Sequence, residues 1–182
     1  MKNKKKYFIL LLLCLLLLMC IFVFKKKDIN TVDIENKNVD TNNKISSISE
    51  TKTVDSLQLI DSNILLTSLG IEKNEVSDYI GKIPEYNNPK GTLYLAIKPV
   101  DKKNELVKKY LEVYVNSLKQ KLENKLNDLS LEDTSLEIVK KQLQDEINYL
   151  NEMIKEEYKG YYIYVSGTDK SEILKLLKER VK

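Results

Sequence analysis

The chain has 182 residues and a formal net charge of +3, and it contains no histidine and only two cysteines. The charged residues before position 28 are seven lysines, so removing them from the total leaves the rest of the chain at −4. This acidic remainder argues against a nucleic-acid partner, which would require a basic surface. Without histidine, and with both cysteines inside an apolar run, the chain offers no imidazole base, no Cys/His nucleophile pair and no Cys/His zinc cluster. We therefore expect no metal and no cofactor.

Residues 7–24 form a run of eighteen residues without a charge, a glycine or a proline. As a helix this run would be about 27 Å long, close to the ~30 Å thickness of a bilayer's hydrocarbon core. Flanking lysines are expected to contact the membrane surface: Lys4, Lys5, Lys6, Lys25, Lys26 and Lys27. The pattern predicts a transmembrane anchor over residues 1–27, with the cell membrane as a partner.

Two other interpretations of this segment stay open. A cleaved secretory signal requires small residues at its cleavage site, and none follows Leu18 before the lysines. A lipoprotein signal would make Cys20 the site of lipidation, but Cys20 follows Met19 and the apolar run continues to Phe24. A retained, single-pass anchor fits the sequence best. Four lysines precede the span and three follow it, so the positive-inside rule predicts that residues 28–182 are extracytoplasmic.

Residues 28–53 are rich in Asn, Asp, Ser, Thr and Lys, and their isolated apolar residues keep no period. Such a segment cannot bury enough apolar surface to offset its chain entropy. We predict a disordered polar stalk, which would hold a domain of residues 54–182 within roughly 25 to 30 Å of its anchor.

The first part of that domain alternates between regular patterns and breaks. Apolar residues at three- and four-residue intervals predict a helix over residues 54–69, capped by Gly70. A short, less regular segment follows at residues 73–80, and the prolines and glycine of residues 84–91 predict a loop. Residues 92–100 alternate as a strand does, with Leu93, Leu95 and Ile97 on one side.

Two long amphipathic stretches follow the strand. The first begins near residue 102, the second begins at residue 136 and ends at residues 159–160, and a polar turn separates them. Their apolar stripes predict an antiparallel helical hairpin. The hairpin has two interpretations, either as part of the core or as a protruding coiled-coil arm that packs on another protein.

The chain ends in a strand and a helix. Residues 160–167 are the clearest strand, and Asp169 followed by Glu172 predicts a capping box that opens the last helix. The two strands should pair antiparallel, with a further strand or a second subunit completing the sheet. We therefore predict an α+β domain: a small antiparallel sheet packed by a long antiparallel helical hairpin and a C-terminal helix.

Several segments, taken in order, carry a resemblance. They are LGI at 69–71, DYIGKIP at 78–84, LYLAIKP at 93–99 leading into ELVKKYLEVY, and EEYKGYYIYVSGTDKSEI at 156–173. Together they resemble an uncharacterised domain-of-unknown-function family found in membrane-anchored proteins and lipoproteins of Gram-positive bacteria. The resemblance covers residues 55–182 and implies an extracytoplasmic location. It supplies no catalytic residue and no substrate.

The functional candidates are aromatic. Eleven tyrosines are unusual in a chain of this size, and Tyr94, Tyr162 and Tyr164 could form an interaction surface if they are exposed on one face of the sheet. Glu156 and Glu157 are the most tempting pair of carboxylates, but neighbouring residues on a helix end would not converge on one substrate atom. The common catalytic and nucleotide-binding signatures are absent from the sequence.

The sequence thus predicts a non-enzymatic binding or structural protein of the bacterial cell envelope, which contacts the membrane and either another envelope protein or a second copy of itself. One alternative is a lipoprotein or an accessory subunit of a membrane complex. A carboxylate-dependent envelope hydrolase is the other.

Overall fold

The computed structural model describes residues 41–43, 45, 57–101, 103–129 and 136–181. The chain divides into two units, residues 1–39 and 40–182, and every described residue belongs to the second. The predicted anchor, its flanking lysines and Cys20 lie outside the described residues. Within the described ranges, no helix is both long and apolar enough to cross a membrane.

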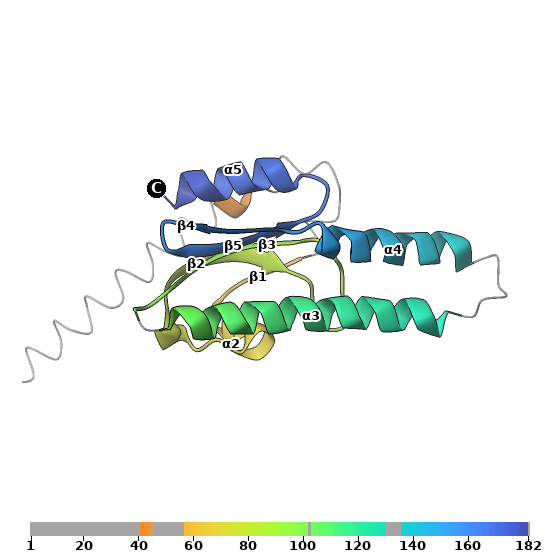
Figure 1. Cartoon of the computed structure of the whole chain (residues 1–182), viewed down its shortest axis with the longest axis horizontal. Coiled ribbons are helices and arrows are strands. Elements are labelled where there is room, and N and C mark those ends of the chain that lie inside the picture. Colours follow the sequence, from red (N-terminus) through yellow and green to blue (C-terminus); the bar gives the residue numbers. More distant parts are fainter. Residues whose placement is uncertain (1–40, 44, 46–56, 102, 130–135, 182) are drawn as a thin grey trace, which may run out of the picture. The chain divides into compact units, whose positions relative to one another are not determined.

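The fold is α+β, built on one antiparallel sheet of five strands (Figure 1). The strands are β1 (Gln58–Leu59), β2 (Val76–Ile83), β3 (Leu93–Pro99), β4 (Ile154–Tyr158) and β5 (Tyr161–Ser166). Their order across the sheet is β1-β2-β3-β5-β4. The two predicted strands, β3 and β5, lie side by side at the centre and pair antiparallel, as predicted.

Three strands complete the sheet, and the sequence did not reveal them. The segment at residues 73–80 is a 3-10 turn, Lys73–Glu75, followed by the eight residues of β2. The second hairpin helix ends at Asn151 and not near residue 159, because residues 154–158 form the edge strand β4. The predicted helix over residues 54–69 is shorter, since Gln58 and Leu59 pair with β2. A second subunit is therefore not required to complete the sheet.

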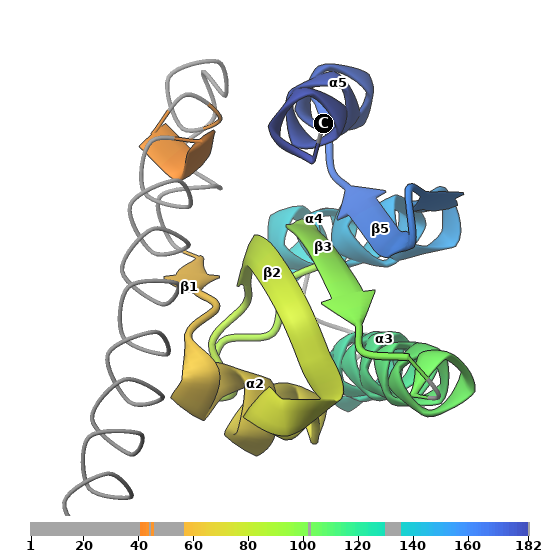
Figure 2. The same ribbon diagram turned by 90° about the vertical axis from the view of Figure 1, so that its left-hand side faces the viewer.

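Helices cover both faces of the sheet (Figure 2). On one face lie α2 (Ser62–Leu69) and α3 (Asn104–Asp128), and on the other lies α5 (Lys170–Arg180). Strand residues alternate between the two cores as their pleat requires. Leu93, Leu95 and Ile97 pack toward α3, whereas Tyr94 and Ala96 pack toward α5.

The folded unit begins earlier than predicted. Residues 41–43 and 45, which were predicted to belong to a disordered stalk, are helical, and Ile45 belongs to the core on the α5 face. Ile45 is fully buried, and the Asn42 side-chain oxygen accepts a hydrogen bond from the Tyr94 hydroxyl at 2.9 Å. The prediction was wrong here because a single isoleucine among polar residues gives no periodic pattern. Its burial depends on the sheet and α5, which lie far along the chain.

The ends of α2 and α5 test the two predicted helix caps. The Asp61 side chain caps α2 by accepting from the Ile64 backbone N–H at 2.7 Å, and Gly70 closes the helix in the left-handed conformation, with φ of 70°. The predicted glycine cap is confirmed. The predicted capping box of α5 is wrong, because Asp169 makes no side-chain cap hydrogen bond.

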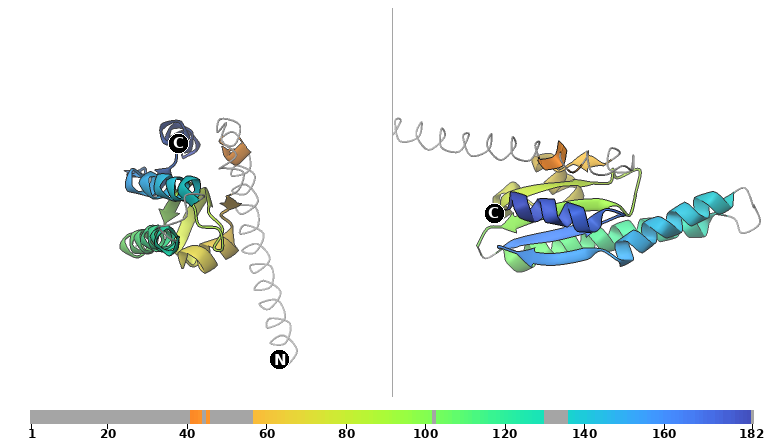
Figure 3. Two further views of the ribbon diagram at one scale, coloured as in Figure 1. Left: turned by 90° about the vertical axis from the view of Figure 1, so that its right-hand side faces the viewer. Right: turned by 90° about the horizontal axis from the view of Figure 1, so that it is seen from above.

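Part of the helical hairpin belongs to the core, and part of it projects from the sheet. The first half of α3 lies over the sheet, and its second half packs against α4 (Glu137–Asn151). Only Ile147 and Leu150 of α4 are buried, both near its end. We call α4 and the half of α3 beside it the helical arm, which extends past the strands in the right-hand view of Figure 3.

The base of the arm is fixed to the sheet at Gly91. The backbone N–H of Gly91 donates to the Glu146 carboxylate, and the Gly91 carbonyl accepts from the Ser166 hydroxyl. A Cβ atom at position 91 would lie 1.7 Å from the Glu146 carbonyl oxygen. Only glycine therefore allows this approach, which sets where the arm leaves the sheet.

Candidate functional site

The three tyrosines predicted as an interaction surface do not form one. Tyr94 is fully buried, Tyr162 is 8% exposed and Tyr164 is 3% exposed. They also lie on opposite faces of the sheet, with Tyr94 toward α5 and the other two toward α3. The prediction required these tyrosines to be exposed, and the helices on the two faces of the sheet bury them.

The hydroxyl of Tyr164 has a hydrogen-bond partner beneath the helix that covers it. It donates to Glu112 of α3 at 2.7 Å, and the Lys155 ammonium donates to the other Glu112 oxygen, also at 2.7 Å. Burial and this hydrogen bond raise the pKa of Tyr164. Burial alone would raise the pKa of Glu112, but the hydrogen bonds from Lys155 and Tyr164 outweigh it and lower that pKa. These contacts attach α3 to the sheet.

A second polar cluster attaches α5 to β2. Asp78 pairs with Arg180 through both carboxylate oxygens, and one of them also accepts from the Tyr161 hydroxyl at 2.6 Å. The side chains of Arg180 and Asp78 are 8% and 15% exposed, so the pair is largely withdrawn from water. Burial, with the hydrogen bond to Asp78, raises the pKa of Tyr161 to about 12. These contacts connect the end of α5 to the sheet.

The carboxylates considered as an acid/base pair are also separated. Glu156 and Glu157 are neighbours on strand β4, where successive side chains point to opposite faces. Glu156 forms an ion pair with Lys178 at 2.6 Å, while Glu157 is exposed. They therefore do not face a common substrate position.

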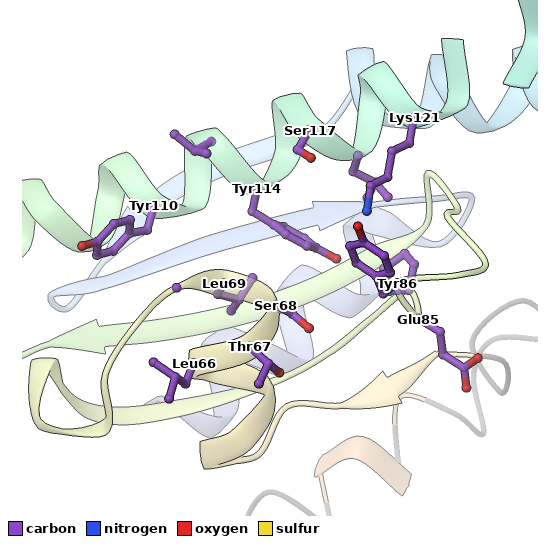
Figure 4. A pocket seen from close by; sticks show the side chains of 14 residues that line it. Leu66, Thr67, Ser68, Leu69, Glu85, Tyr86, Tyr110, Tyr114, Ser117 and Lys121 are labelled. Atoms are coloured by element: carbon purple, nitrogen blue, oxygen red, sulfur yellow. The ribbon is translucent and has the colours of Figure 1, made fainter. Parts of the chain in front are cut away.

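A cavity lies elsewhere, between α2, α3 and the start of the loop after β2 (Figure 4). Its volume is about 340 Å³. We call it the tyrosine groove. Its lining residues are Leu66, Thr67, Ser68, Leu69, Gly70, Pro84, Glu85, Tyr86, Tyr110, Val113, Tyr114, Ser117, Leu118 and Lys121.

Aromatic and hydroxyl groups converge in this groove. Tyr114 projects from α3 toward Tyr86, and the Lys121 ammonium lies 3.5 Å from the centre of the Tyr86 ring (Figure 4). Ser117 faces the groove from α3, and Thr67 and Ser68 line it from α2. The arrangement offers flat apolar area, hydroxyls that can donate or accept hydrogen bonds, and one cation.

The groove also concentrates exposed apolar side chains. Six large apolar side chains are exposed among the described residues, and three of them line the groove: Tyr86 at 75%, Val113 at 56% and Leu66 at 54%. Scattered apolar residues on a surface are ordinary, whereas a cluster at a concave site marks a place where another molecule binds. The tyrosine groove is therefore the candidate functional site.

The ionisable groups of the groove are few. Besides tyrosines it contains Glu85 and Lys121, and the Glu85 carboxylate points away from the cavity (Figure 4). Burial raises the pKa of Tyr114, so its hydroxyl stays neutral around physiological pH. In the described part of the chain, no three His, Cys, Asp or Glu residues come together in a way that could hold a metal ion.

Sequence reasoning missed the groove, although one signal was present. Beside its core stripe, α3 carries a second series at three- and four-residue steps, formed by Tyr110, Tyr114, Ser117 and Lys121. Two tyrosines beside a complete apolar stripe indicate a helix with a second contact surface. Tyr86, however, lies in a loop and has no pattern that would connect it to α3.

Comparison of the chain with protein-family models, with curated proteins and with solved structures found no match. The functional conclusion below therefore depends on the groove and on the sequence of the chain itself.

Proposed function

We propose that this chain is a membrane-tethered, extracytoplasmic binding protein of the bacterial cell envelope, and that the tyrosine groove is where it holds its partner. The location comes from the apolar run at residues 7–24 with its lysine flanks. The binding role is carried by one observation, the gathering of exposed Leu66, Tyr86 and Val113 around a cavity of about 340 Å³.

The chemistry of the groove favours a protein segment as the partner. Tyrosines offer rigid area with little entropy to lose, and they dominate the centres of protein interfaces. The aliphatic side chains of Leu66 and Val113 are exposed beside them, where a partner's apolar side chains can cover them. If the chain is instead an accessory subunit of a membrane complex, the same groove would bind another subunit of that complex.

The hydrolase alternative receives less support. Carboxylate-dependent hydrolysis of a glycan requires two carboxyl groups on either side of the bond that is cleaved. Glu85 is the one carboxylate among the residues that line the groove, and its side chain points outward.

Photo-crosslinking in intact cells tests the proposal. A photoreactive amino acid placed at Leu66, in the full-length chain, should capture a protein, because this position lines the groove and is exposed. The matched control places the same amino acid at Lys175, an exposed position of α5 on the opposite side of the sheet. Equal product patterns from the two positions would contradict the assignment of the groove.

A reporter fusion tests the location separately. Alkaline phosphatase fused after residue 182 should be active, because it folds only outside the cytoplasm. An active cytoplasmic reporter at the same position, with inactive phosphatase, would reverse the predicted orientation without affecting the groove.

A further inference from the structure

The exposed apolar side chains outside the groove gather at a second place. Ile138 is 72% exposed and Val139 is 40% exposed, and both lie at the start of α4. Together with the three at the groove, they account for five of the six exposed large apolar side chains of the described residues. One chain thus presents a hollow apolar patch and a projecting one.

We propose that the tyrosine groove of one copy takes the helical arm of a second copy, with Ile138 entering the groove. The inference rests on the proposed function, because it names the partner of the same binding site. A projecting surface whose apolar side chains match a cavity elsewhere on the same molecule produces contacts between copies.

The shapes of the two patches agree with this arrangement. The groove lies between two helices, and the projecting patch is the first turn of a third, which is how an amphipathic helix lies in a groove. The following residues of α4, Lys140, Lys141 and Gln142, are polar. Only the end of the arm is therefore suited to insertion, as a groove of about 340 Å³ requires.

The arm cannot reach the groove of its own chain. Leu150, near the end of α4, is buried at the base of the arm, and Ile138 lies twelve residues earlier, about 18 Å along the helix. Figure 3 shows that the start of α4 lies at the far end of the arm. The groove is lined by α2, α3 and residues 84–86, whereas α4 packs along α3, so Ile138 is held with α4 outside the groove of its own chain.

Charge supports the same pairing. Glu137 is exposed beside Ile138 in the first turn of α4, and Lys121 lies at the groove. A copy that inserts the start of α4 therefore brings an acidic residue to a groove whose one lysine is Lys121. Opposite charges at the edge of an interface steer association and fix its register.

A reciprocal pair is the simplest closed form of this contact. If each copy inserts its arm into the groove of the other, both patches on both copies are covered, and the contact is made twice around a two-fold axis. Two chains anchored in the same membrane are also held at high effective concentration, so a modest contact is sufficient.

A crosslinking experiment with the full-length chain in cells tests the proposal. Cys14 and Cys20 are replaced by alanine, and chains with different tags carry Val113→Cys and Ile138→Cys. A short thiol-reactive crosslinker should join the two tags, because Val113 lines the groove. The matched control pairs Ile138→Cys with Lys175→Cys. The first pair should give more product than the control pair, because a specific contact holds its two thiols together, whereas chance encounters in the membrane join both pairs equally.

A third variant shows whether the product depends on the apolar contact. Val139→Asp, next to the inserted residue, should reduce the product of the first pair. Gln144→Asp, exposed on the same helix, should leave it unchanged. Equal reductions by both variants, or equal products from the first pair and the control pair, would overturn the proposal.

The experiment separates this inference from the proposed function. If the thiol pair gives no product while the photoreactive residue at Leu66 captures a different protein, the second copy is not the partner, and the groove remains a binding site. If neither experiment gives a product, both the inference and the proposed function fail.

Discussion

Two sets of three tyrosines in this domain differ in their surroundings: one set is buried in the sheet, and the other, Tyr86, Tyr110 and Tyr114, lines the tyrosine groove. Tyr94, Tyr162 and Tyr164 lie on the central strands β3 and β5. Their side chains point to one face of the sheet or the other, and all three are buried because helices cover both faces. The tyrosines of the groove come from a loop and from α3, and one of them, Tyr86, is 75% exposed. Whether a tyrosine contributes to the core or to a binding site therefore depends on whether other elements of the fold cover its ring.

The buried tyrosines should contribute to the stability of the fold, and the groove tyrosines should contribute to binding. A strand tyrosine beneath a helix contributes apolar burial and a satisfied hydroxyl, as Tyr94 does with Asn42. At the groove, Tyr86 leaves most of its ring in water until a partner binds, while Tyr110 and Tyr114 are partly buried against the core and form the wall of the cavity. Substitutions in the first set should therefore change the free energy of unfolding, and substitutions in the second should change association.

Tyr94→Ala should have the largest effect on stability. The side chain is fully buried between the sheet and α5, so its removal leaves a cavity and should cost about 3–5 kcal/mol of the free energy of unfolding. Tyr94→Phe is the control, since it removes only the hydroxyl and should cost about 1 kcal/mol. Urea unfolding of the purified chain measures both, and equal losses for the two variants would show that packing around Tyr94 is unimportant.

Asp78→Ala should come next. The substitution leaves the Arg180 guanidinium, only 8% exposed, without its carboxylate, and the loss of one member of a buried ion pair costs about 3 kcal/mol. The double variant Asp78→Ala with Arg180→Met should recover part of the loss, because no charge then remains buried. If the double variant is less stable than the single one, the cost comes from packing of α5 and not from the loss of the Asp78 carboxylate.

Tyr161 should make the domain sensitive to alkali. Burial raises its pKa to about 12 from an ordinary value near 10, so the folded state holds the proton more tightly than the unfolded state does. The stability from this group is complete below pH 10 and is lost as the pH rises through 12. Tyr161→Phe should cost about 1 kcal/mol at neutral pH and make the fall in stability between these pH values less steep. Urea midpoints at neutral and alkaline pH test this, and an unchanged alkaline slope would contradict it.

The central strands and the antiparallel pairing could be predicted because their signals are local. Alternation in residues 92–100 placed Leu93, Leu95 and Ile97 on one side of a strand, and in the structure all three lie in the core on the α3 face. The charged strands β2 and β4 could not be predicted in the same way. Asp78 in β2 is neutralised by Arg180, 102 residues later, and Glu156 in β4 is paired with Lys178. No pattern within either strand contains that information.

The candidate site was less accessible to sequence reasoning than the fold. The groove requires α2, α3 and the loop after β2 to come together, and these elements are separated in the chain. The count of tyrosines did indicate that aromatic residues matter. It could not distinguish Tyr164, whose hydroxyl is used by Glu112, from Tyr114, whose hydroxyl faces the groove.

Tyr86→Ala should have the smallest effect on stability and the clearest effect on binding. The ring is mostly exposed and its described contact is with Lys121, so its loss should change the free energy of unfolding by less than about 0.5–1 kcal/mol. The same variant should strongly reduce capture by the photoreactive residue at Leu66, because it removes a rigid aromatic wall of the groove. Tyr94→Phe, of comparable stability cost, should leave capture unchanged. Loss of capture in both variants would mean that binding follows stability, and the division between the two sets of tyrosines would then be wrong.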